Sequence, residues 1–123
     1  PGTTATWSAT VEARHLVPAL FPGDPPTANA PKVLATPWLV AMIEYTAAIG
    51  LLPHLDEGET SVGTRIDVQH LAPSPEHETI TLAATCTAID GRQSIWSVVA
   101  RDSRREIGRA VHHRAVIGPP PGK

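Results

Sequence analysis

The run TPWLVAMIEYTAAIG, Thr36 to Gly50, limits what this chain can fold into more than any other feature. Thr36 before Pro37 is typical of a helix start, with Thr36 as the N-cap, and Gly50 is typical of a helix end. Apolar residues cover every face of this expected helix, so other elements must surround it. Its one charged residue is Glu44, and burying an unpaired carboxylate costs on the order of several kcal/mol.

After this helix the pattern changes to an alternation with a period of two, which is typical of strands. In the strand expected at residues 62–71, one face carries Val62, Thr64, Ile66, Val68 and His70. Further strands are expected at residues 6–17, 78–90, 92–102 and 105–117. Asp90–Gly91 predicts a hairpin between two of them, and a polar turn is expected near residues 102–105.

The order of one strand, one helix and four antiparallel strands predicts an α+β domain whose sheet wraps around the helix. The 123 residues fit a single domain, which we place at residues 1–117. Residues 18–35 are rich in proline and are expected to form a long, lid-like loop, and residues 118–123 a disordered tail. One helix covers only part of five strands, so the remaining apolar surface and open edges favour a homodimer.

Composition argues against several functions. The net charge of −2 gives no electrostatic basis for binding nucleic acid or an anionic membrane. No apolar run reaches the roughly 18 residues of a spanning helix, and residues 1–16 do not resemble a signal peptide. Together with the single cysteine, Cys86, this favours a cytoplasmic protein. His112 and His113 point to opposite strand faces and no other Cys/His cluster exists, so no metal site is expected.

Four residues are candidates for chemistry. Glu44 is either a general base or nucleophile, or a carboxylate at a packing gap or paired with an arginine. His70, on the inward strand face, is either a partner for Glu44 or a core histidine bonded to a backbone carbonyl. Thr36 is either a simple cap or lies near a substrate carbonyl at the positive helix end. Gly63 marks a bulge or close backbone approach, or supplies an N–H for an oxyanion.

Three segments carry a family resemblance: ATPWLVAMIEYTA, LDEGETSVGTRIDVQHLAPSP and EIGRAVHHRAVI. Together they resemble the fluoroacetyl-CoA thioesterase-like family of hotdog-fold proteins, from about Val33 to Ile117. The resemblance implies a strand-rich sheet wrapped around a long helix, in a unit that is at least a dimer. It also implies hydrolysis of a short-chain acyl-CoA thioester without a metal or cofactor, coenzyme A being part of the substrate.

Carried over residue by residue, Thr36, Glu44 and His70 match the family's catalytic threonine, glutamate and histidine. Gly63 matches a glycine near the substrate carbonyl. Arg114 matches an arginine of the last strand that is associated with the site, and we expect both residues to contact substrate. The resemblance therefore implies that the helix carboxylate attacks the thioester or activates water against it.

The family's fluoroacetyl-specific enzyme carries a lid phenylalanine six residues before the threonine, where this chain has Ala30. Phe21 or Trp38 could substitute only in part, so fluoroacetyl selectivity is not expected. Two alternatives remain open. One is a non-catalytic hotdog protein that binds acyl-CoA or another small ligand. The other is an enoyl-CoA hydratase-like hotdog enzyme, although that group pairs aspartate with histidine near the helix start, and this helix has glutamate and no histidine.

Overall fold

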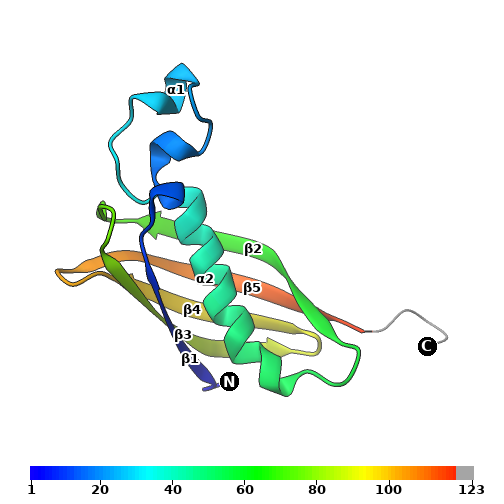
Figure 1. The fold of residues 1–123 in the computed structure, drawn as a ribbon. Helices are drawn as coiled ribbons and strands as arrows, with labels where there is room; N and C mark the ends of the chain where they lie inside the picture. Colours follow the sequence, from blue (N-terminus) through cyan, green and yellow to red (C-terminus); the bar gives the residue numbers. More distant parts are fainter. Residues whose placement is uncertain (119–123) are drawn as a thin grey trace.

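The computed structural model describes residues 1–118 of the chain, so the expected tail lies outside the described residues except for Gly118. A long helix lies across one face of a sheet whose five strands all pair antiparallel (Figure 1). The elements are β1 (Thr4–Thr10), η1 (Ala13–His15), η2 (Val17–Ala19), α1 (Pro25–Ala28), α2 (Thr36–Leu51), η3 (Leu52–His54), β2 (Thr60–His70), β3 (Thr79–Asp90), β4 (Gln93–Arg101) and β5 (Glu106–Ile117). This arrangement confirms the predicted α+β class.

The strand order is β1-β3-β4-β5-β2, which leaves β1 and β2 as the two edges of the sheet. Three of the strands follow one another through short turns, as the sequence predicted. The β3–β4 hairpin turns at Asp90–Gly91, where Gly91 has a φ of +62°. Asp102 N–H donates to the Arg105 carbonyl at 3.0 Å, which closes the polar turn between β4 and β5.

The core lies between α2 and the sheet, and Trp96 is the largest fully buried side chain in it. The inner side of α2 is apolar apart from Thr46, whose hydroxyl donates to the Met42 carbonyl at 2.8 Å. The sequence suggested that the helix ends at Gly50, but α2 continues to Leu51. A Cβ atom at position 50 would lie 2.8 Å from the Trp96 ring, so glycine here permits close packing.

Strand β2 contains a bulge next to Gly63, where this glycine suggested one, although the predicted alternation ran through it without a break. Its pairing with β5 shifts register between Gly63 and Arg65, so odd-numbered residues face α2 before the shift and even-numbered residues face it afterwards. Ile66, Val68 and His70 are partly buried, as predicted. The prediction is wrong for Val62, which is 42% exposed, and for Thr64, which is also exposed.

The segment between β1 and α2 differs from the expected strand and loop. Strand β1 ends at Thr10, and the chain then makes short helical turns instead of extending to residue 17. Most of the proline-rich segment 18–35 stands beyond the start of α2, away from the sheet (Figure 1). Leu34 N–H donates to the Ser74 carbonyl at 2.8 Å, which ties the end of this segment beside the helix start.

Candidate active site

Thr36 and His70 form a hydrogen-bonded pair where α2 begins and β2 ends. Thr36 Oγ1 lies 2.8 Å from His70 Nδ1. The expected N-cap role of Thr36 is wrong, because Ala35 occupies the N-cap position and Thr36 is the first helical residue. From that position its hydroxyl bonds the histidine ring on the neighbouring strand, and no side chain caps the helix.

His70 presents an unpartnered nitrogen at this place. Its ring is half-buried, and Nε2 is inaccessible to solvent with no hydrogen-bond partner among residues 1–118. Burial lowers the pKa of His70 below its usual value, and the backbone at Ala72 opposes this in part. A buried polar atom without a partner is uncommon, and a role in binding or catalysis is one explanation for it. The ring is therefore neutral near pH 7 and has one nitrogen available for a ligand or a reacting group.

A cavity of about 310 Å³ adjoins the pair. Apart from Thr36 and His70, its lining is entirely apolar: Val17, Val33, Leu34, Leu71, Ala72 and Pro73. A small apolar cavity with a few convergent polar groups is the usual form of a binding site. Neither Ala30, Phe21 nor Trp38 lines it, so none of the three acts as a wall of this cavity.

Glu44 lies two turns further along α2 and faces a different group of residues. A Cβ atom added to Gly63 would lie 3.1 Å from Glu44 Oε1 and 2.9 Å from His112 Cε1. Gly63 is therefore a close approach as well as a bulge position, as the sequence predicted. The Glu44 carboxylate accepts no hydrogen bond from any residue that the structure describes. It also takes part in none of the ion pairs within 4.0 Å found in residues 1–118.

Arg114 lies on the other side of Gly63, paired with it across β2 and β5. It is only 7% exposed. Its Nε donates to Ser61 Oγ, its Nη2 to the Ser61 carbonyl and its Nη1 to His112 Nε2, each at 3.1 Å. Burial lowers the pKa of Arg114, and the negative charge of Glu44 opposes this. The guanidinium thus lies near the carboxylate without an ion pair within 4.0 Å, and three of its five N–H donors are used within the chain.

Thr36 and His70 are therefore not beside Glu44 in a single chain. Eight residues of helix separate Thr36 from Glu44, about 12 Å. Seven residues of strand separate Gly63, which contacts Glu44, from His70, roughly 20 Å. The expected partnership of His70 with Glu44 is not formed within one chain, where His70 bonds Thr36 instead.

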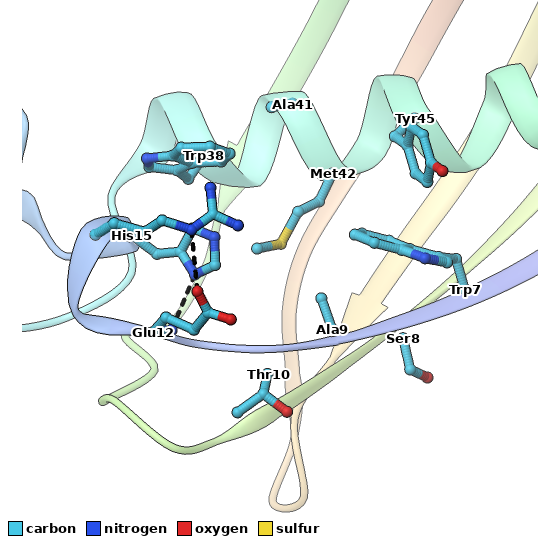
Figure 2. Close-up of a pocket in the computed structure, with 11 residues that line it drawn as sticks. Trp7, Ser8, Ala9, Thr10, Glu12, His15, Trp38, Ala41, Met42 and Tyr45 are labelled. Atoms are coloured by element: carbon cyan, nitrogen blue, oxygen red, sulfur yellow. Dashed lines mark hydrogen bonds and ion pairs between the residues drawn. The ribbon is translucent and has the colours of Figure 1, made fainter.

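A second and larger cavity, of about 480 Å³, lies between β1 and α2 (Figure 2). Trp38 forms one end with His15, at 4.6 Å between ring centroids, and Trp7 with Tyr45 forms the other, at 4.9 Å. The Arg14 guanidinium lies 4.9 Å from the Trp38 centroid. This cavity shares no residue with the smaller one, and it brings together no hydroxyl–histidine pair, so the chemistry is better placed at Thr36 and His70.

Neither a metal site nor a membrane-spanning helix is found in the part of the chain that the structure describes. Within residues 1–118 the structure has no cluster of three His, Cys, Asp or Glu side chains suited to a metal ion. The helices in the described part of the chain are too short or too polar to cross a membrane.

A single long helix wrapped by a five-stranded antiparallel sheet defines the hotdog fold, here with a Thr–His pair at the helix start. A hot-dog-like protein from Thermanaerovibrio acidaminovorans has this fold, with a TM-score of 0.81 at 22% identity over 95% of this chain and 82% of that one. The family model described as "Fluoroacetyl-CoA-specific thioesterase" matches residues 24–119. The chain belongs to this family.

Two relatives support this assignment. The fluoroacetyl-CoA thioesterase of Streptantibioticus cattleyicolor is 37% identical over 116 residues, which is 94% of this chain and 84% of the relative. A crystal structure of a point mutant of the fluoroacetyl-CoA-specific thioesterase FlK, in complex with fluoroacetate and CoA, has a TM-score of 0.90. Its identity to this chain is 38%, and the match covers 95% of this chain and 94% of that one.

Sequence reasoning missed two residues that lie near Glu44 and Arg114, namely His112 and Ser61. His112 was considered only as a metal ligand, and Ser61 was not considered. A signal existed for His112, because it shares strand parity with Arg114 and so faces the same side of β5. No such signal existed for Ser61, because the bulge in β2 reverses the parity of its half of the strand.

Proposed function

We propose that this protein is an acyl-CoA thioesterase that hydrolyses short-chain acyl-CoA at a site of Thr36, Glu44 and His70. The observation that carries the proposal is the Thr36–His70 bond beside a small apolar cavity, with His70 Nε2 buried and unpartnered. The family membership supports the same reaction. The cavity accommodates the acyl group, and the helix start places the positive end of the helix dipole near the carbonyl oxygen.

In the proposed reaction the Glu44 carboxylate either attacks the thioester carbonyl or takes a proton from an attacking water. The oxyanion that forms receives hydrogen bonds from the Thr36 hydroxyl and the Gly63 N–H. The tetrahedral intermediate then collapses with cleavage of the C–S bond, and His70 passes to the departing thiolate a proton that comes from the water. If Glu44 is the nucleophile, that water hydrolyses the acyl–Glu44 anhydride in a second step, which releases the carboxylic acid and restores the Glu44 carboxylate. Because a thiolate is a good leaving group, the reaction needs no metal or cofactor.

The working unit of this proposal is a homodimer joined along β2. Strand β2 is an edge of the sheet, so its outer hydrogen-bonding groups are open to a second copy. An antiparallel pairing of two β2 strands centred near Ile66–Asp67 sets Gly63 of one protomer opposite His70 of the other. Glu44, which contacts Gly63, then approaches the Thr36–His70 pair of the other subunit. This arrangement accounts for the separation of the three residues within one chain.

A thioester assay tests the reaction. Pure protein is mixed with a panel of acyl-CoA esters of two to eight acyl carbons, and free coenzyme A is detected with a thiol-reactive chromophore. We expect turnover of the short esters, and a loss of at least about a hundredfold in Glu44→Gln, the usual scale for removing a general base. Glu57→Gln is the control, since Glu57 is an exposed carboxylate. Binding without turnover would instead favour a non-catalytic module.

A complementation experiment tests the shared site. Glu44→Gln and His70→Ala chains carrying different affinity tags are coexpressed, and the mixed dimer is isolated. If each site takes Glu44 from one protomer and His70 from the other, one of the two sites is intact and activity returns to about half of wild type. If each site lies within one protomer, both sites carry a defect and the mixed dimer stays as inactive as the parents.

A further inference from the structure

We infer that His112 is a positioning residue that, together with Ser61, holds the Arg114 guanidinium beside Glu44. The inference rests on the proposed function, because it takes Glu44 as the reacting carboxylate. It gives Arg114 a role through Glu44, beside the expected contact with substrate. All three residues lie around Gly63, where β2 and β5 pair beneath α2.

The tautomer of His112 follows from its two partners. Its Nδ1 lies 2.8 Å from the Arg65 carbonyl, and its Nε2 lies 3.1 Å from Arg114 Nη1. A carbonyl only accepts and a guanidinium N–H only donates, so Nδ1 carries the proton and Nε2 is the acceptor. His112 is 0% exposed, and burial is the main cause that lowers its pKa. The ring is therefore neutral and fixed on both sides.

This neutral ring determines where the positive charge of Arg114 lies. Nη1 is fixed by His112, while Nε and Nη2 are fixed by the hydroxyl and the carbonyl of Ser61. A guanidinium held at three points cannot turn to follow a mobile ligand, but it presents a steady charge to a neighbour. That neighbour is Glu44, whose negative charge acts on Arg114. Glu44 Oε1 and His112 Cε1 both lie within about 3 Å of the point where a Cβ atom of residue 63 would stand.

Glu44 itself is held by packing and by this charge, since it accepts no hydrogen bond within residues 1–118. A carboxylate in that state keeps its oxygens open for water or for a carbonyl carbon. The two residues that fix Arg114 then act on the reaction only through Glu44. Their removal is expected to lower the rate of the chemical step and to leave acyl-CoA binding unchanged.

Kinetics of four variants test this. His112→Leu and Ser61→Ala are expected to lower kcat roughly tenfold or more, with KM within about twofold, the scale seen when an orienting residue is removed. His112→Gln is expected to retain most of kcat, because its amide donates to the Arg65 carbonyl and accepts from Arg114. His113→Leu is the matched control, since His113 lies on the other face of β5. Equal losses in His112→Leu and His113→Leu would overturn the inference.

The same variants in a Glu44→Gln background separate positioning from general damage. If His112 and Ser61 act through Glu44, their substitution costs less than about twofold once the carboxylate is gone. The same fold loss in both backgrounds would overturn the inference. Ser61→Ala serves where His112→Leu does not fold, because Ser61 is only partly buried.

Histidine ¹⁵N NMR of the wild-type protein tests the inferred tautomer of His112 and does not depend on enzyme activity. We expect His112 to show a protonated Nδ1 and an unprotonated Nε2 at pH 7, and Ser61→Ala to leave this tautomer in place. A protonated Nε2 would overturn the inference whatever the kinetics show. Absence of hydrolysis by the wild-type protein would refute the proposed function, and the NMR result would still decide the His112 assignment.

Discussion

The Thr36 hydroxyl oxygen lies 2.8 Å from His70 Nδ1, although 34 residues separate the two in the sequence. The bond joins the first turn of α2 to the last residue of β2. It also fixes the orientation of the imidazole ring, because the opposite nitrogen, Nε2, has no partner in the described part of the chain. Loss of this hydroxyl should therefore affect the histidine as well as any substrate that the hydroxyl contacts.

Thr36→Val keeps the shape of the side chain and removes the hydroxyl. We expect kcat/KM for a short acyl-CoA to fall at least about tenfold, because one hydrogen bond to the ring and one to the oxyanion are lost together. Thr36→Ser keeps the oxygen and should retain most of the activity. Thr27→Val is a suitable control, since the buried Thr27 hydroxyl has no partner within residues 1–118 and its removal should leave turnover unchanged. Equal activity in Thr36→Val and Thr36→Ser would contradict this role.

Gly63→Ala tests the close approach between β2 and α2. The added Cβ would lie 2.9 Å from His112 Cε1, which belongs to a fully buried ring that cannot move away easily. We expect a loss of about 1–3 kcal/mol in the free energy of unfolding, typical of overpacking, and a lower kcat because Glu44 is displaced. Urea unfolding and the thioester assay measure the two effects. Thr60→Ala, exposed on the same strand, should change neither.

Stability should fall on mild acidification. Burial is the first cause that lowers the pKa values of His15, His70 and His112. The folded state thus favours the neutral rings, so their contribution is fully present above the unfolded pKa of about 6.5 and is lost as pH falls below it. Urea midpoints should be constant from about pH 8 to 7 and decrease towards pH 5.5. His15→Asn should make this decrease shallower. A midpoint independent of pH over this range would show that the prediction is wrong.

Selectivity for a fluorinated acyl group should be low. The cavity beside Thr36 has no Phe, Trp or Tyr in its lining, and Ala30 stands where the family resemblance places a lid phenylalanine. One fluorine changes size little, so rejecting acetyl-CoA requires a closely shaped, water-excluding wall. We expect similar kcat/KM values for fluoroacetyl-CoA and acetyl-CoA, after correction for intrinsic thioester reactivity. Ala30→Phe should raise the ratio; a ratio of many orders of magnitude in wild type would place selectivity in other residues.

Much of the fold could be predicted because its signals are local. The apolar run around Glu44 and the period-two segments from residue 78 onward gave the helix and the strands β3, β4 and β5 to within two residues. The segment at 6–17 was predicted less well, since β-branched and polar residues near Trp7 do not show where β1 gives way to 3₁₀ turns. Proline content indicated the loop at 18–35 but not the short helix within it.

The candidate site residues could be named from the sequence, but their grouping could not. Thr36 and His70 meet because the end of β2 lies beside the start of α2, and that contact depends on tertiary packing. Glu44 meets Gly63 and Arg114 because β2 and β5 pair in one particular register. Register and side-chain direction depend on the bulge; Gly63 suggested a bulge, but the sequence did not show which side chains change face because of it.

The extra residue in β2, Thr64, changes which positions of this strand face α2. Before the register shift, odd-numbered positions such as Ser61 and Gly63 face α2; after it, even-numbered positions such as Ile66 and His70 do. Gly63, Arg65 and Ile66 lie opposite Arg114, His113 and His112 in turn, so the bulge takes up Thr64 and both halves of the strand keep the same face towards α2. Deletion of Thr64 would therefore leave Gly63 and His70 on that face. Deletion of one residue after the bulge, such as Asp67, would turn His70 to the opposite face, because a one-residue shift reverses every side chain beyond it.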